Sequence, residues 1–358
     1  MVKLDDINKI REIDREDMLD ILLDLPGQCK DAIAIANGFK AHSGYKASGI
    51  NKIFFSGVGG SAIGGDIVRT YLSRQMDEPI LVNRNYDVPA FVDQKTLVFV
   101  SSYSGNTEET LSAYRQIKKK GAKMIAVTSG GELYERALGD GIPFILLPEG
   151  FPPRTAIGYM SIVPLIALSK MRFIKNKDKE LREVLKVLVE LRQKALSPEV
   201  PAPKNIAKQA AKEIYGRFVI IYAAEDFLGS VAARCRQELE ENSKIICSAS
   251  ALPEMNHNEI TGWEDPKRIS KDFAIIILLD KDEHPRVSRR IQISKEIIAK
   301  KAGRIIEIKS RGSSLLARTF SLIYIGTFIS FYLAILNGVD PTPVTNVTYL
   351  KKKLAKDR

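Results

Sequence analysis

Cysteine is scarce in this chain of 358 residues, and its scarcity excludes two kinds of protein. The three cysteines, Cys29, Cys235 and Cys247, form no CxxC pair. A disulfide-stapled secreted domain and a cysteine-based zinc site are therefore not expected. The pattern fits a reducing cytosol in which the thiols are buried, so a cytoplasmic protein is predicted.

Histidine and tryptophan are rare as well, with three residues and one residue respectively. No cluster of histidine and cysteine has the spacing of metal ligands, so a metal site is not expected. The net charge is +11, but basic stretches interleaved with aromatic residues are lacking, so nucleic acid is not the expected partner. Two interpretations of the charge stay open: a solvated basic surface, or a small phosphorylated substrate.

Only one apolar run, Ser321–Asp340, is long enough to cross a bilayer. It has no basic cluster on its immediate flanks, and Gly326, Thr327 and Ser330 interrupt it. A buried core helix is therefore predicted, and no association with a membrane. The charged, amphipathic N-terminus does not have the pattern of a signal peptide.

Strand-like apolar runs alternate with helical patterns, which predicts an α/β fold with two doubly wound, mainly parallel sheets. A charged and then proline-rich stretch predicts a connecting helix and a linker between them. The expected parts are an N-terminal helical segment (1–40), a first α/β domain (41–170), the connection (171–206), and a second α/β domain with a C-terminal helix and tail (207–358).

The two halves resemble each other at domain scale. RFVIIYAAEDFLGSVAARCRQELEE parallels KIFFSGVGGSAIGGDIVRTYL, with a strand, a turn and a helix in each. The matching turns differ, because the second half carries Glu225, Asp226, Asp282 and Glu283 where the first carries glycines and hydroxyl residues. Only the first half is therefore expected to hold an anion readily.

Hydroxyl side chains gather at two strand ends of the first half. Gly60 and Ser61 open the helix after KIFFSGVG, and SSYSGNTEET supplies Ser102, Ser104 and Thr107 after the strand TLVFVSS. A turn from a strand into a helix exposes unpaired N–H groups at the positive end of the helix dipole. Plain N-capping is the alternative interpretation, but it needs only one such residue per helix. A phosphate site is therefore predicted.

Several motifs carry a resemblance to a known family. SSYSGNTEET together with GVGGSAIGGD resembles the sugar isomerase (SIS) domain, whose hydroxyl-rich loop binds the phosphate of a sugar phosphate. Over nearly the whole chain, FPPRTAIGY, ELEENSK and EMNHNEITGW resemble the bifunctional phosphoglucose/phosphomannose isomerase family. The resemblance implies two tandem SIS domains. It also implies isomerisation of glucose 6-phosphate, and of mannose 6-phosphate, to fructose 6-phosphate through an enediolate, without a cofactor or a metal.

Aldose–ketose isomerisation needs a base, a group that opens the sugar ring, and a cation or donor for the developing oxyanion. From spacing alone, a solvated run of acids is the better interpretation of Glu238, Glu240 and Glu241. The family pattern at this point is Asn-Glu-Asn-Ala-Lys, and it aligns Glu241 with the base. Glu240 and Ser243 depart from that pattern.

The resemblance assigns roles to other residues. His257 would open the ring and come from the partner subunit, which implies a homodimer with shared active sites. Arg154 would stabilise the enediolate. A family threonine that implies acceptance of either C2 epimer corresponds to Thr342 or, in another alignment, to Thr345. A family lysine maps onto Lys351, one of three consecutive lysines.

A non-catalytic sugar-phosphate sensor of the same fold is the alternative function. A sensor needs only the hydroxyl loop, so the joint presence of Glu241, His257 and Arg154 favours an enzyme.

Overall fold

The computed structural model describes residues 3–40, 45, 47–264 and 270–356. The chain divides into two compact units, each built around one sheet. The first-sheet unit comprises Asp24–Lys186 and Gly312–Ala317. The second-sheet unit comprises Met1–Leu23, Val187–Arg311 and Arg318–Arg358. The chain passes from one unit to the other after Leu23, after Lys186, after Arg311 and after Ala317.

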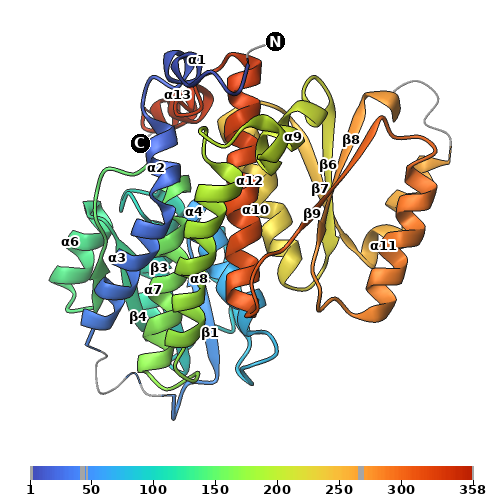
Figure 1. The fold of residues 1–358 in the computed structure, drawn as a ribbon. Coiled ribbons are helices and arrows are strands. Elements are labelled where there is room, and N and C mark those ends of the chain that lie inside the picture. The colour runs from blue at the N-terminus through green and yellow to red at the C-terminus, as the bar shows by residue number, and fades with distance from the viewer. Residues whose placement is uncertain (1–2, 41–44, 46, 265–269, 357–358) are drawn as a thin grey trace. The chain divides into compact units, whose positions relative to one another are not determined.

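The first-sheet unit alternates strands and helices as the apolar pattern predicts (Figure 1). Its elements are α3 (Leu25–Gly38), β1 (Lys52–Ser56), α4 (Gly60–Leu72), β2 (Ile80–Asn83), β3 (Thr96–Ser101), α5 (Glu108–Lys119), β4 (Lys123–Thr128), α6 (Gly131–Gly139), β5 (Phe144–Leu146), the 3-10 turn η1 (Pro153–Thr155), α7 (Ile157–Lys170) and the start of α8 (Asp178–Leu191).

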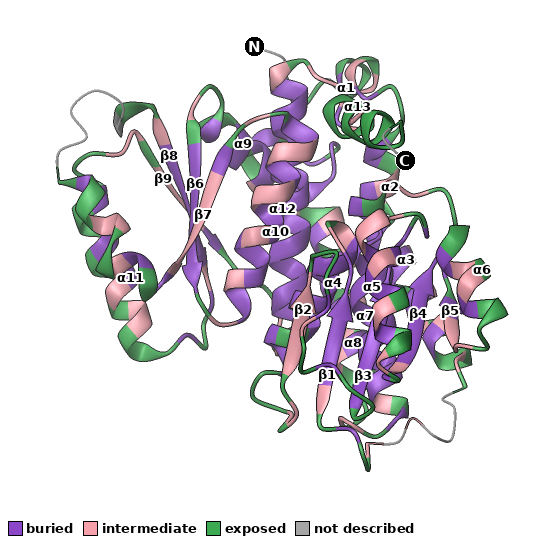
Figure 2. Ribbon diagram, turned by 180° about the vertical axis from the view of Figure 1, so that it is seen from behind, coloured by how far each residue is buried: buried purple, intermediate pink, exposed green. Residues whose placement is uncertain are grey.

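The first sheet has the strand order β2-β1-β3-β4-β5, and every neighbouring pair is parallel. One face packs on α5 and α6 through a cluster that includes Val98, Leu111 and Leu133. On the other face α4 approaches Phe55 so closely that a Cβ on Gly65 would lie 2.8 Å from the Phe55 side chain. Helices therefore cover both faces, and the strands β3 and β4 are buried almost along their whole length (Figure 2).

The second-sheet unit begins with two short N-terminal helices and then repeats the alternation. Its elements are α1 (Ile7–Ile13), α2 (Met18–Leu23), the end of α8, a π-helical turn η2 (Arg192–Leu196), the 3-10 turn η3 (Ala202–Lys204), α9 (Ile206–Ile214), β6 (Phe218–Ala224), α10 (Phe227–Ser243), β7 (Cys247–Leu252), the 3-10 turns η4 (Glu254–His257), η5 (Glu259–Trp263) and η6 (Ser270–Asp272), β8 (Phe273–Leu279), α11 (Pro285–Ile298), β9 (Arg304–Lys309), α12 (Leu315–Asn337) and α13 (Thr345–Leu354).

The second sheet has the order β7-β6-β8-β9 and is also parallel throughout. α11 lies on one face, where Ile291 and Ile298 pack on strand residues such as Ile275. α10 and α12 cover the opposite face, with Leu239 and Ile329 close to the sheet. Two parallel sheets, each with helices on both sides, confirm the predicted α/β class.

The long apolar run of the sequence forms α12, which begins at Leu315 and ends at Asn337. By length and composition it could cross a membrane, but its entire apolar window is buried inside the protein (Figure 2). Burial on all sides explains why the helix has no polar face. It is a core helix, as predicted.

Candidate active site

The first sheet changes the direction of its connections between β1 and β3. With the order 2-1-3-4-5, the loops after these adjacent strands diverge, and ligands of such sheets bind in the crevice at this switch point. The two loops meet closely here: a Cβ on Gly57, just after β1, would lie 2.6 Å from the backbone oxygen of Ser101, at the end of β3. The topology thus brings together the two stretches that the sequence predicts as a phosphate site.

The four predicted hydroxyl residues lie at this switch point. Ser61 Oγ accepts a hydrogen bond from the N–H of Tyr103 at 3.2 Å, which joins the start of α4 to the loop after β3. Ser102 Oγ and Thr107 Oγ1 are 2.9 Å apart and hydrogen-bonded. Ser104 is exposed, and its Oγ accepts from the N–H of Asn106 at 3.4 Å. The hydroxyl groups are therefore held by contacts within the two loops.

Neither helix at the switch point has a side-chain N-cap. α4 begins after Gly59 and α5 after Thr107, and no side chain accepts a cap hydrogen bond at either position. The Thr107 hydroxyl is bonded to Ser102 instead. Plain N-capping therefore does not account for the hydroxyl cluster. α4 and α5 each begin at one of the two loops that meet at the switch point, and the partial positive charge at a helix N-terminus favours an anion.

Arg154 lies beside the start of α4. A Cβ on Gly60 would be 2.6 Å from the backbone oxygen of Pro153 and 3.2 Å from the Cα of Arg154, so only glycine allows this approach. Arg154 is 4% exposed. The structure thus places a buried arginine next to the hydroxyl cluster.

α3 holds the Arg154 segment from another side. Gln28 is buried, and its Nε2 donates to the backbone oxygen of Thr155 at 2.9 Å. Its Oε1 accepts from the N–H of Gly158 at 2.7 Å. The side-chain amide therefore satisfies two backbone groups at the start of α7, where the helix lacks a side-chain cap.

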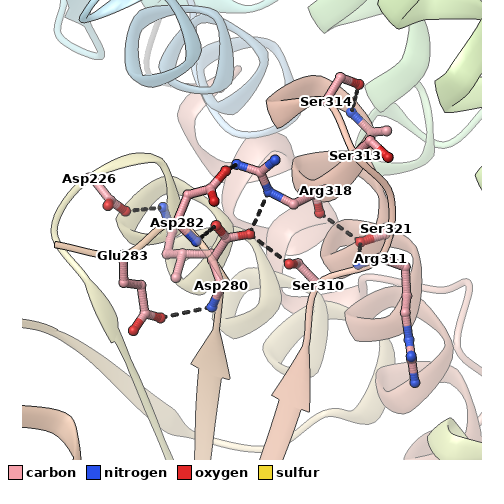
Figure 3. A network of polar contacts seen from close by, with 12 residues as sticks. Asp226, Asp280, Asp282, Glu283, Ser310, Arg311, Ser313, Ser314, Arg318 and Ser321 are labelled. Atoms are coloured by element: carbon pink, nitrogen blue, oxygen red, sulfur yellow. Dashed lines mark hydrogen bonds and ion pairs between the residues drawn. The ribbon is translucent and has the colours of Figure 1, made fainter. Parts of the chain in front are cut away.

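The corresponding switch point of the second sheet, between β6 and β8, is occupied by its own charges (Figure 3). The buried Arg318 pairs with Asp280 at 2.8 Å and with Asp282 at 2.7 Å. Asp226 caps α10, and Glu283 Oε1 accepts from the N–H of Asp280 at 2.8 Å. Burial raises the pKa of the Glu283 carboxyl, and the Asp226 and Asp280 carboxylates add to the rise. A second phosphate would meet carboxylates here.

The three acids at the end of α10 have different surroundings. Glu238 is buried, forms an ion pair with Arg234, and accepts from the hydroxyl of Thr327 at 2.6 Å. Glu240 is half-buried and pairs with Arg236 at 2.8 Å. Glu241 is half-buried at the last turn of the helix. The run is thus not simply a solvated face, because one of its members is part of the core.

The backbone that carries Glu241 is fixed to α12. Asn242 Nδ2 donates to Ser330 Oγ at 2.9 Å. Ser243 Oγ donates to the backbone oxygen of Ser330 at 2.6 Å, and Asn337 Nδ2 donates to the backbone oxygen of Ser243 at 2.9 Å. These contacts leave the helix end little freedom.

Lys244 follows α10 in a left-handed conformation, with φ of 58°. Its Nζ donates to the backbone oxygens of Glu241 and of Pro341, the latter at 3.0 Å. The turn that contains Thr342 is therefore tied to the helix end that carries Glu241. Thr345 is exposed and is the first residue of α13.

His257 and Lys351 lie on other elements of the second-sheet unit. His257 ends the turn η4, which follows β7, and is exposed. Lys351 is exposed on α13. Close to the His257 segment, Trp263 Nε1 donates to the hydroxyl of Tyr222 at 3.1 Å, and that hydroxyl donates to Glu259 at 2.7 Å. Within the described residues, no group of three histidine, cysteine or acidic side chains is arranged to hold a metal ion.

The comparisons with known proteins identify the family. The profile of the SIS domain matches residues 48–137, and that of the bacterial phospho-glucose isomerase C-terminal SIS domain matches residues 203–354. A bifunctional phosphoglucose/phosphomannose isomerase from Caldicellulosiruptor bescii is 43% identical over 339 residues, which cover 95% of this chain and 99% of that protein. The chain belongs to the bifunctional phosphoglucose/phosphomannose isomerase family. A second member, from Aquifex aeolicus, is 36% identical over 85% of this chain and 90% of its own length.

The tandem SIS architecture of the family is therefore present, as predicted from the motifs. Among solved structures, a hypothetical protein from Thermus thermophilus is similar with a TM-score of 0.77, covering 98% of this chain and 94% of that one. The identity is 14%, so this likeness supports the fold alone.

Proposed function

We propose that this isomerase-family protein interconverts fructose 6-phosphate with glucose 6-phosphate and with mannose 6-phosphate. The observation that carries the proposal is the β1/β3 switch point, where two helix N-termini without side-chain caps and four hydroxyl groups lie beside a buried arginine. We assign the phosphate of the sugar to Gly60, Ser61, Ser102, Ser104 and Thr107.

The reaction requires three chemical roles, and we assign one residue to each. His257 donates and accepts the proton that opens the sugar ring. The Glu241 carboxylate takes the proton from C2 of the open aldose and returns it to C1, while the hydroxyl proton of O2 passes to O1. The charge that develops on oxygen in the enediolate is stabilised by the Arg154 guanidinium. No metal or cofactor takes part in this scheme.

Glu241 suits the role of base better than its two neighbours. A base must reach the substrate, whereas Glu238 is buried in the core with its ion-pair partner Arg234. Glu240 pairs with Arg236 one helical turn away and stands where the family pattern has asparagine. We therefore keep the family alignment of the base.

We assign the choice between C2 epimers to Thr342 rather than Thr345. The support is Lys244, whose Nζ donates to the backbone oxygens of Pro341, next to Thr342, and of Glu241 at the end of α10.

Lys351 is proposed as a further residue that contacts the substrate. We also propose a cytoplasmic homodimer in which His257 serves the active site of the partner subunit; the exposure of His257 is compatible with that role.

The decisive experiment separates an isomerase from a sugar-phosphate sensor. Purified protein is given fructose 6-phosphate with EDTA, and coupled assays follow glucose 6-phosphate and mannose 6-phosphate. We expect both aldoses from the wild type. Glu241→Gln should lose about 10²–10⁴-fold or more in kcat but should still bind fructose 6-phosphate in calorimetry.

Glu240→Gln is the matched control, because it makes the same change one residue away and should retain most of the activity. A dead Glu240→Gln with an active Glu241→Gln would assign the base to Glu240. Binding of fructose 6-phosphate without any product from the wild type would identify a sensor.

A further inference from the structure

Tyr103 stands between two of the proposed phosphate-binding serines and is 4% exposed. The sequence pattern does not single it out, because tyrosine is neither one of the small hydroxyl residues typical of a phosphate loop nor a charged residue. Its contacts, all within the first-sheet unit, connect four separate segments of the site.

The main chain of Tyr103 joins the loop after β3 to the elements on either side. Its N–H donates to Ser61 Oγ at the start of α4, at 3.2 Å. Its backbone oxygen accepts from the Ser129 hydroxyl at 2.6 Å and from the Ser129 N–H at 3.0 Å, just after β4. These contacts set the position of the tyrosine ring relative to the hydroxyl cluster.

The phenol of Tyr103 reaches the segment that leads to Arg154. Its hydroxyl donates to the backbone oxygen of Pro148 at 2.6 Å and accepts from the N–H of Phe151 at 3.1 Å. A tyrosine hydroxyl is protonated at neutral pH and can donate, and burial raises the pKa of the Tyr103 phenol further. Both contacts are to the main chain and so do not depend on the side chains at positions 148 and 151.

The chain between Phe151 and Arg154 is stiff, so the position of Phe151 largely determines that of Arg154. Pro152 and Pro153 intervene, and each proline fixes its own φ. Few backbone torsions are therefore free between the Phe151 N–H and the Arg154 Cα. On the far side, the backbone oxygen of Pro153 packs against Gly60 of the phosphate site.

We infer that Tyr103 is a positioning residue that couples the phosphate loop to Arg154. A phosphate held by Ser102 and Ser104 fixes the loop on either side of Tyr103. The hydrogen bonds of the phenol then restrict the position of the segment that carries Arg154. The inference rests on the proposed isomerase function and on the role of Arg154 in it. A purely structural tyrosine would contribute stability and leave the chemical step unchanged.

The test is Tyr103→Phe, which keeps the ring and its packing but removes both phenol hydrogen bonds. We expect kcat to fall about tenfold, with KM for fructose 6-phosphate changed less than about twofold. Tyr114→Phe is the matched control: this buried residue has a hydroxyl that also has two partners, Asp140 at 2.8 Å and the backbone oxygen of Arg136 at 3.2 Å. The control should lose a similar amount of thermal stability and no kcat.

A double-mutant cycle with Tyr103→Phe and Arg154→Ala distinguishes positioning of Arg154 by Tyr103 from a general loss of structure. In the Arg154→Ala background, Tyr103→Phe should cause no further loss of kcat, because its effect passes through the arginine. Full additivity of the two losses, or a kcat of Tyr103→Phe equal to that of the wild type, would overturn the inference and leave the isomerase function standing. A wild type without isomerase activity would overturn both.

Discussion

At the residue scale, burial separates hydroxyls that the sequence presents as equivalent. Ser61 and Ser102 are buried and hydrogen-bonded to Tyr103 and Thr107 respectively, so each of them helps to hold the two loops in place. Ser104 is exposed, and the 3.4 Å contact from Asn106 is long for a hydrogen bond. Of these hydroxyl groups, that of Ser104 can rotate toward a bound phosphate without breaking a strong hydrogen bond within the loop.

Ser104→Ala should therefore weaken substrate binding with little effect on folding. The lost bond to a charged phosphate is worth about 1.5–3 kcal/mol, or roughly 10–150-fold in KM for fructose 6-phosphate. Steady-state kinetics and thermal unfolding of the same preparation give both quantities.

Ser73→Ala is a suitable control for this change, because Ser73 is an exposed serine at the opposite end of α4 whose hydroxyl donates to the backbone oxygen of Thr70. An unchanged KM in the double variant Ser102→Ala/Ser104→Ala would contradict the assignment of the phosphate site.

At the element scale, α10 contains two ion pairs with the same i,i+4 spacing, one of them buried and the other partly exposed to solvent. The side chains of Arg234 and Glu238 are 1% and 2% exposed, whereas those of Arg236 and Glu240 are 36% and 34% exposed. The sequence alone treats Glu238 and Glu240 as alike. The structure corrects this, because removing the Glu238 carboxylate takes an ion-pair partner from a buried guanidinium.

Glu238→Gln should accordingly destabilise the protein by about 3–5 kcal/mol, the usual cost of breaking one side of a buried pair. Glu240→Gln should cost about 0.3–0.5 kcal/mol, as expected for a pair on a helix surface. Urea unfolding followed by circular dichroism compares the two variants directly. Equal effects would show that burial does not decide the strength of these pairs.

The start of α4 depends on a glycine for its approach to the Arg154 segment. Gly60→Ala would place a Cβ 2.6 Å from the backbone oxygen of Pro153, so that segment must shift. We expect at least about a hundredfold loss of kcat, the scale associated with a displacement of about 1 Å at a catalytic group.

Gly139→Ala, at the last residue of α6, provides the comparison for the glycine substitution, since a Cβ there would meet nothing within 4 Å. It should keep full activity and gain up to about 1 kcal/mol of stability from the reduced freedom of the unfolded chain. A Gly60→Ala protein with normal kcat would show that the close contact does not position Arg154.

At the scale of the whole molecule, the proposed sharing of His257 between subunits makes the assembly part of the chemistry. Glu241→Gln and His257→Ala homodimers should each be inactive. After subunit exchange, one site of each hybrid dimer combines an intact Glu241 with an intact His257. Random exchange should restore roughly a quarter of the wild-type activity, because about half of the dimers are hybrid and each has one complete site.

Mass spectrometry of the intact complexes verifies the exchange before activity is measured. Complete exchange without any recovered activity would mean that base and histidine act from one chain.

Much of the fold was predictable, because it is encoded locally. Apolar runs such as those that form β3 and β6 have the length and composition of buried strands, and both strands lie where they were expected. β7 was missed. Its sequence CSASAL consists mostly of small residues, and its central four residues are only half-buried at the sheet edge, so it lacks the apolar pattern that signals a strand.

The sequence by itself determined the α/β class, the buried nature of α12, the motifs of the family and the hydroxyl cluster, since each is a property of residues near one another in the chain. The tertiary structure alone decided that Ser61 and Tyr103, 42 residues apart, are hydrogen-bonded, and that Glu238 belongs to the core while Glu241 does not. It also decided that Arg154 approaches Gly60. The physical reason is that strand order and helix packing select partners across long stretches of chain, and local periodicity records which face of an element is buried but not what covers it.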